Sequence, residues 1–312
     1  MDVSIAAVPQ AKTNPIVLDE RRQKTVRTLI NASHRKLLFL DQVVDWEKGI
    51  DFSKPPKVAE SSWIYGTPYW DMLTPEQRTE TLWLETGRDV SYFIWLEQTL
   101  PELYVGYVNK YHGELSDEVR EYLMVFSREE IVHTLMFRRY LEKANLRLWS
   151  HPENIPNYSL FERQLAGKHP VYGICWNLLI EWFAELNSIF QTQTDGIDPL
   201  TRQMFKEHHL EEVRHIAFAK TICENYFESA PKEEMAEMQE FFQKGYGFLL
   251  DEYTYMPEIA LHASFTFPIQ PGDTDKIREV RNSPNNQRLN HARFRDVREW
   301  CEKYGIIKAE QA

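Results

Sequence analysis

Residues 207–220 read EHHLEEVRHIAFAK and contain a Glu-x-x-His motif formed by Glu212 and His215. A second motif of the same form occurs upstream at Glu130 and His133. Residues three apart on an α-helix share one face, so each motif directs one carboxylate and one imidazole toward the same point. Two such helices, together with one inward glutamate from each of two other helices, form the ligand set of a two-metal carboxylate site in a four-helix bundle.

Glu97 is the expected carboxylate on the first of the two other helices. It interrupts an apolar stripe that contains Phe93, Leu100 and Tyr104 at three- and four-residue steps. A lone buried carboxylate is costly unless it is paired or bound to a metal, so this position favours a ligand. Glu102 is the competing ligand on the same helix.

The last expected carboxylate lies in residues 175–190, CWNLLIEWFAELNSIF, which are almost wholly apolar. A helix that is hydrophobic on all sides is buried, and a glutamate inside it needs a partner. We expect Glu181 to be this ligand. Glu185 lies one turn further along the same helix and is the alternative.

Three more polar residues belong to the same pattern. His208 precedes Glu212 by four residues on the same helix face, so this helix can present three ligands. A ligating histidine usually donates its other N–H to a carboxylate or carbonyl, and Glu211 is the candidate acceptor. Glu129 either has a similar role or faces solvent. Carboxylate and imidazole ligands suit iron or manganese, whereas zinc takes fewer ligands and fewer carboxylates.

Composition and charge narrow the class of protein. The 312 residues are 43% apolar, which is enough for a sizeable core, and the net charge of -11 argues against non-specific nucleic-acid binding. Three widely spaced cysteines suggest no disulfide framework and fit a reduced, cytoplasmic compartment. We find no signal-peptide pattern and no apolar run of membrane-spanning length, so no membrane association is expected.

The chain reads as all-α, without strand hairpins. We expect residues 1–16 to be disordered and residues 17–312 to form a single helical domain whose metal-binding bundle covers about 75–227. Two helices should begin with an N-cap followed by proline, at Thr74-Pro75 and Asp198-Pro199. Helices are expected at about 19–46, 75–111, 115–144, 170–194, 198–227, 231–262 and 286–303. Residues 47–72 and 145–168 should be long loops, and 263–284 should be irregular.

These motifs resemble those of the ferritin-like di-iron oxygenases. Residues 211–215, Glu-Glu-Val-Arg-His, look like the acidic-Glu-x-Arg-His signature of that superfamily, with Glu where Asp is more usual. Within it, the chain resembles the arylamine N-oxygenases, the p-aminobenzoate N-oxygenase family, which have an additional histidine ligand at the place of His208. The resemblance covers about residues 75–230. It implies a ferritin-like four-helix bundle with additional flanking helices, and the metal ligands Glu97, Glu130, His133, Glu181, His208, Glu212 and His215.

The same resemblance implies a function. A homodimer with two iron ions, or manganese in their place, would use O2 and an external electron donor to oxidise a small-molecule amine. The amine would become a hydroxylamine and then a nitroso or nitro compound, in secondary metabolism. A largely aromatic pocket near the ligands is expected to hold the substrate, lined by Tyr92, Phe93, Trp182, Asn187, Phe190 and Gln191.

Other functions remain alternatives at this point. A di-iron hydroxylase or desaturase of another small molecule, or a ribonucleotide-reductase radical subunit, would share the fold, but His208 argues against the desaturase and the radical subunit. A ferroxidase or metal-storage protein would have no organic substrate, and the two long loops favour a covered substrate pocket instead. An interaction protein without metal would require four inward carboxylates to be coincidental.

Overall fold

The computed structural model describes residues 15–149, 164–192 and 194–308, without the side chains of 186–192, 248 and 250–253. Within these ranges the chain is helical, and the one β-type pairing is an isolated bridge between Ile16 and Leu115. The prediction of an all-α fold is therefore confirmed. None of the described helices is both long enough and apolar enough to cross a membrane.

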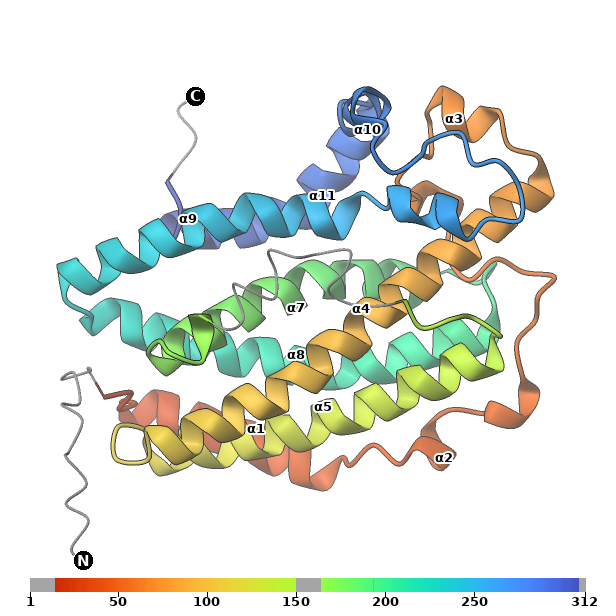
Figure 1. Cartoon of the computed structure of the whole chain (residues 1–312). Helices are drawn as coiled ribbons and strands as arrows, with labels where there is room; N and C mark the ends of the chain where they lie inside the picture. The colour runs from red at the N-terminus through yellow and green to blue at the C-terminus, as the bar shows by residue number, and fades with distance from the viewer. Residues whose placement is uncertain (1–14, 150–163, 193, 309–312) are drawn as a thin grey trace, which may run out of the picture.

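Four long helices form the bundle, and their bounds lie within a few residues of the predicted ones. They are α4 (Pro75–Lys110), α5 (Asp117–Lys143), α7 (Pro170–Thr192) and α8 (Pro199–Ser229). Helix α4 packs along α5, α7 packs along α8, and α5 also contacts α8 (Figure 1). Short connections join the members of each pair, as antiparallel neighbours require.

Both predicted N-caps are present in the structure. The hydroxyl of Thr74 accepts from the N–H of Gln77, whose side chain accepts in return from the N–H of Thr74, which forms a capping box. Asp198 accepts from the N–H of Thr201 at 2.7 Å. The same buried carboxylate also accepts from the N–H of Asp51 at 2.7 Å, so it ties the loop over residues 47–72 to the start of α8.

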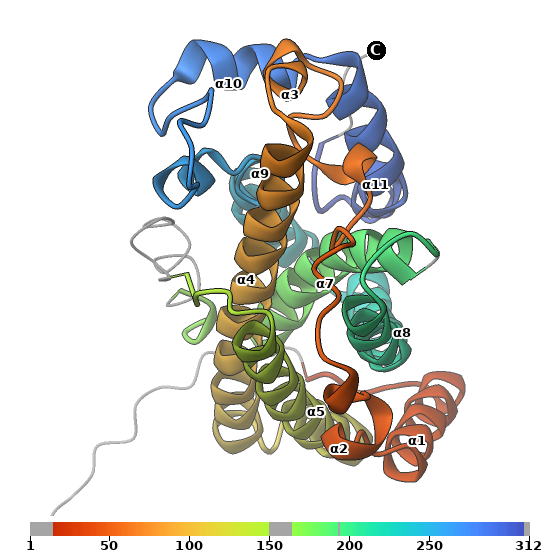
Figure 2. The same ribbon diagram turned by 90° about the vertical axis from the view of Figure 1, so that its right-hand side faces the viewer.

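Further helices cover two sides of the bundle. Helix α1 (Glu20–Arg35) lies against α5 and α8, whereas α9 (Lys232–Thr254) and α11 (Pro284–Lys303) lie against α7 (Figure 2). This coverage explains why the sequence of α7 is apolar on all sides, since the helix has neighbours around most of its circumference.

The predicted first helix over residues 19–46 is wrong in its second half. Helix α1 ends at Arg35, and a short helix α2 (Leu40–Val43) and a 3-10 turn (Trp46–Lys48) follow. The side chain of Trp46 is buried, and its indole N–H donates to the carbonyl of Leu40 at 2.7 Å. The chain therefore turns in order to bury this tryptophan, which a straight continuation of α1 would not allow.

Two boundaries near the C-terminus also differ from the prediction. The helix expected over 231–262 ends at Thr254, and a 3-10 segment (Pro257–Leu261) follows, because proline cannot donate a helical hydrogen bond and disfavours helix in the residue before it. A short helix, α10 (Thr274–Arg281), lies within the segment expected to be irregular.

Residues 47–72 contain a 3-10 turn (Ala59–Ser61) and helix α3 (Pro68–Asp71), and they contribute to a second apolar cluster. Trp63 is buried there and stacks on Phe267 with ring centroids 6.4 Å apart. The segment predicted to be a surface loop therefore has a packing role. The predicted disorder of residues 1–16 falls mostly on residues 1–14, which lie outside the described residues, while Ile16 is buried.

Gly173 allows α7 to approach α4 closely, and its replacement should destabilise the bundle. A Cβ atom at this position would lie 2.3 Å from the hydroxyl of Tyr107, which is buried and donates to the carbonyl of Leu165 at 2.9 Å. We expect Gly173→Ala to lower the free energy of unfolding by about 1–3 kcal/mol, measured by urea unfolding.

Gly106 is the matched control, because a Cβ there meets nothing within 4 Å and the residue lies on the exposed side of α4. Gly106→Ala should leave the stability unchanged or raise it by about 0.5–1 kcal/mol. Equal stability of the Gly173→Ala variant and the unmodified protein would contradict the close packing of α4 and α7 at this point.

Candidate metal centre

The structure brings all seven predicted ligand residues together inside the bundle. Helix α4 supplies Glu97, α5 supplies one Glu-x-x-His pair, α7 supplies Glu181, and α8 supplies the other pair together with His208. All seven side chains are buried: Glu97, Glu130, His133, Glu181, His208, Glu212 and His215. Each ligand therefore comes from the middle of a regular helix, where packing holds its orientation.

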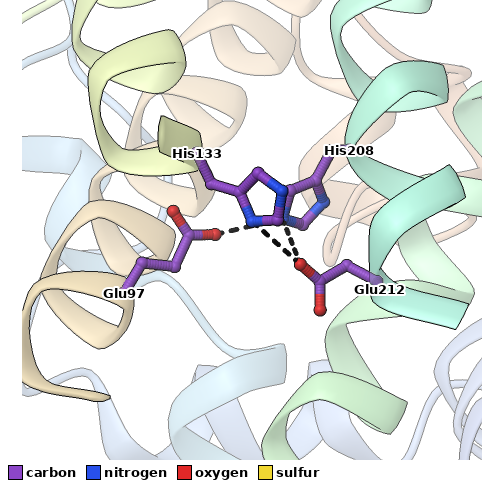
Figure 3. A group of neighbouring side chains, drawn as sticks. All are labelled: Glu97, His133, His208 and Glu212. Carbon is purple, nitrogen blue, oxygen red and sulfur yellow. Dashed lines mark hydrogen bonds and ion pairs between the residues drawn. The ribbon is translucent and has the colours of Figure 1, made fainter. Parts of the chain in front are cut away.

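The first group of ligand atoms consists of Glu97, His133, His208 and Glu212, whose candidate ligand atoms all lie within 4.8 Å of one another. Nε2 of His208 is 3.0 Å from Oε1 of Glu97 and 3.1 Å from Oε1 of Glu212. Nδ1 of His133 is 3.1 Å from the same Glu212 oxygen. Figure 3 shows these side chains from α4, α5 and α8 directed toward one another.

The second group consists of Glu130, Glu181, Glu212 and His215, within the same mutual distance. Nδ1 of His215 is 3.0 Å from Oε1 of Glu130 and 3.2 Å from Oε2 of Glu212. The side-chain amide of Asn177 donates to Oε1 of Glu181 at 2.7 Å, which orients this carboxylate from one turn away. Glu212 belongs to both groups, so its carboxylate lies where it could bridge two neighbouring ions.

The charges and unpartnered atoms of the two groups fit two divalent metal ions. Oε2 of Glu97 and Oε2 of Glu181 are buried, and neither makes a hydrogen bond to any residue that the structure describes. A buried carboxylate oxygen without a partner is costly, and a metal ion would satisfy it. The four ionised carboxylates of the set would balance the charge of two divalent cations, and the imidazoles could bind as neutral ligands.

The pKa values of the carboxyl groups reflect this crowding. Burial raises the pKa of Glu97 to about 8, although the hydrogen bond with His208 opposes the rise. Burial, with the nearby Glu212, raises the pKa of Glu181 well above its ordinary value. Burial would also raise the pKa of Glu212, but the imidazoles of His215 and His208 hold it well below its ordinary value. Cations at the centre would relieve the repulsion between these carboxylates.

Two additional glutamates hold the histidines of the Glu-x-x-His motifs in a reciprocal arrangement. Nε2 of His133 on α5 is 2.8 Å from Oε2 of Glu211 on α8, and Nε2 of His215 on α8 is 2.9 Å from Oε2 of Glu129 on α5. Each motif is thus preceded by a glutamate that supports the histidine of the other helix. These contacts leave Nδ1 of both histidines directed toward the ligand groups, which fixes the orientation of each ring.

Arg214 and Ser33 complete this support. Nη2 of Arg214 donates to Oε1 of Glu129 at 3.2 Å and to Oε1 of Glu211 at 3.0 Å, and its Nε donates to the hydroxyl of Ser33 at 2.9 Å. Burial would raise the pKa of Glu129, but His215, Arg214 and Ser33 lower it to about 2. Sequence reasoning missed Ser33, because nothing in α1 by itself indicates contact with this site.

A small cavity of about 10 Å³, which has room for about one water-sized group, lies beside the ligand groups. Phe93 and Leu96 of α4 and Ala184 and Glu185 of α7 line it, together with five of the seven predicted ligands. Among the predicted pocket residues with described side chains, Phe93 alone lies on the wall of this cavity. Phe93 and Leu96 give part of its wall on the α4 side an apolar surface.

The other predicted pocket residues with described side chains lie elsewhere. Tyr92 is buried beneath Arg88 and does not line this cavity. Trp182 follows Glu181 by one residue and is therefore turned by about 100° around α7, where it packs on Trp300 of α11. Three predicted residues fall where side chains are not described: Asn187, Phe190 and Gln191.

His208 belongs to the first group alone, which gives a specific prediction. His208→Ala should lower the iron content toward one ion per chain while the helices persist, measured by elemental analysis and circular dichroism. His209→Ala is the matched control, because this neighbour lies outside both groups and should keep its full iron content. Unchanged iron in the His208→Ala protein would remove His208 from the ligand set.

The comparison with protein families agrees with this site. No curated protein matches the chain. The family model described as P-aminobenzoate N-oxygenase AurF matches residues 19–305, which is nearly the whole chain. The match includes all four bundle helices and all seven candidate ligands. The chain therefore belongs to the p-aminobenzoate N-oxygenase AurF family, whose members are O2-dependent di-iron oxygenases with a ferritin-like helical fold.

Proposed function

We propose that this protein is a non-haem di-iron oxygenase that uses O2 to oxidise an arylamine to the hydroxylamine and on to the nitroso or nitro compound. The observation that carries the proposal is the pair of ligand groups joined by Glu212, with His208 in the first of them. The family match supports N-oxygenation over a desaturase, a hydroxylase or a storage protein, since the matched family is described by that reaction.

The chain's own residues would prepare the site for this chemistry. Two iron ions held there would supply the binding and reduction of O2. The four carboxylates and three imidazoles would hold the ions, and Glu129 and Glu211 would keep two of the imidazoles in place. Burial of the whole set excludes bulk water. Phe93 and Leu96 give the small cavity beside the set an apolar surface.

We also propose the partners that this reaction requires. Transfer of one oxygen atom from O2 to an amine, with release of water, consumes two electrons and two protons, so an external electron donor is needed. A homodimer is proposed from the resemblance in the ligand motifs. A cytoplasmic location is proposed because all three cysteines are free and buried, which suits a reducing compartment. A single domain is proposed because one family model matches residues 19–305.

The test is an oxygenation assay with labelled O2. Iron-loaded protein, a chemical reductant and p-aminobenzoate or aniline would be exposed to ¹⁸O2, and we expect ¹⁸O in a hydroxylamine or nitro product by mass spectrometry. Glu97→Gln should abolish the product, whereas Glu102→Gln, an exposed glutamate on the same helix, should retain it. Two bound irons without an oxygenated product from any amine of a broad panel would refute the proposed reaction.

A further inference from the structure

The cavity beside the ligand groups contains one polar side chain that neither group uses. Nine of the described residues line it. Three of these are apolar and five belong to the ligand groups, which leaves Glu185. Its carboxylate therefore faces the cavity without a place in the candidate metal centre.

Glu185 is buried, and neither of its carboxylate oxygens makes a hydrogen bond to a residue that the structure describes. The residue is 4% exposed, and Oε2 makes neither a hydrogen bond nor an ion pair with any residue that the structure describes. Oε1 is in close ion-pair contact with Nδ1 of His209 on α8. Oε2 has no such neighbour among the described residues, and an unpartnered buried acceptor of this kind needs a donor.

The position of Glu185 relative to the centre suits a bound substrate. Glu185 lies one turn after Glu181 on α7, which is a rise of about 6 Å along the helix. An amine that reaches the edge of the ligand groups is therefore within range of its carboxylate. Phe93 and Leu96 of α4 line the same cavity and contribute apolar surface to it.

We propose that Glu185 binds the amino group of the substrate by accepting an N–H hydrogen bond, and so selects primary and secondary amines. The inference rests on the proposed function, because it assigns a binding residue to the amine of that reaction. An acidic acceptor distinguishes an N–H donor from a tertiary amine of similar shape, since only the former can complete the hydrogen bond.

Equilibrium binding tests this assignment without turnover. Iron-loaded protein under nitrogen would be titrated with aniline and with N,N-dimethylaniline by calorimetry, and iron content would be measured on the same samples. We expect Glu185→Leu to weaken aniline binding by roughly tenfold or more, the effect of losing a hydrogen bond to a charged group, while N,N-dimethylaniline changes less than about twofold. Glu185→Gln keeps the volume and one acceptor oxygen and should give a smaller loss.

His209→Ala is the matched control, because it removes the ion-pair partner but keeps the carboxylate, and aniline should bind within about threefold of the unmodified protein. Unchanged aniline binding in Glu185→Leu would overturn the proposal. Equal weakening of aniline and N,N-dimethylaniline binding in Glu185→Leu would show a packing role instead. So would a loss of aniline affinity in His209→Ala equal to that in Glu185→Leu. Loss of iron from Glu185→Gln, with its fold retained, would make Glu185 a metal ligand.

These results are separable from those of the oxygenation assay. Aniline binding that depends on Glu185, in a protein that oxygenates no amine, would keep this assignment and refute the reaction. Oxygenation of an amine whose affinity does not change when Glu185 is replaced would refute this assignment alone.

Discussion

Glu212→Ala is expected to lower the iron content from about two ions per chain to well below one, and to reduce amine oxygenation by roughly a thousandfold or more, equivalent to about 4 kcal/mol in the barrier. The reason is geometric, because the Glu212 carboxylate is the one group shared by both sets of ligand atoms. Its loss also removes the acceptor that faces the imidazoles of His133, His208 and His215. Elemental analysis and the ¹⁸O2 assay measure the two effects.

Glu207→Ala on the same helix is the control, because this half-buried glutamate lies outside both groups. It should retain its iron and most of its activity. An iron content near two ions per chain in the Glu212→Ala protein would show that the shared carboxylate does not bridge the metals.

Arg214→Met should produce the largest loss of stability, about 3–5 kcal/mol in the free energy of unfolding. Arg214 is buried and donates to Glu129 and to Glu211, so its removal takes away the buried donor that these two carboxylates share. The methionine keeps much of the side-chain length, which limits the cavity that results. Urea unfolding of the metal-free protein measures this loss directly, without a contribution from metal binding.

Arg128→Met provides the matched comparison. Arg128 also approaches Glu129, at 3.4 Å, but its side chain is 39% exposed, so solvent screens the pair and less than about 1 kcal/mol should be lost. Equal losses in the two arginine variants would contradict the account of a buried carboxylate network that depends on Arg214.

The ligand helices could be predicted because their signal is local. The three-residue spacing within each Glu-x-x-His motif follows from helix geometry alone, and so does the four-residue step from His208 to Glu212. The choice of Glu181 over Glu185 was harder, since both lie on one apolar helix. Both line the cavity, and the structure places Glu181 but not Glu185 in a candidate ligand group, so Glu181 as the ligand remains a prediction.

The supporting contacts could be predicted only in part, because they depend on which helices meet. Glu211 was expected to hold a ligating histidine, but that its partner is His133 on another helix requires the packing of α5 against α8. Glu129 was left open for the same reason, since its role depends on the position of His215. Ser33 could not be identified, because α1 reaches the site only through tertiary packing.

Aromatic residues account for several of the differences between prediction and structure. The first helical region ends earlier than the periodicity of its sequence indicates, because the chain turns and buries Trp46. Trp63 packs in the second apolar cluster, although the prolines and glycine of its segment suggested a surface loop. Trp182 was expected in the pocket because it is next to Glu181 in sequence, yet adjacent helical residues point in directions about 100° apart. Burial of large rings is decided by tertiary packing, which sequence periodicity does not report.

The central claim is that two metal ions lie in the two ligand groups joined by Glu212, and anomalous X-ray scattering at the iron absorption edge tests it most directly. Crystals of protein produced with ample iron should give two anomalous peaks per chain, one within Glu97, His133, His208 and Glu212 and the other within Glu130, Glu181, Glu212 and His215. A single peak, or no peak at these residues in protein that is folded and iron-replete, would contradict the account.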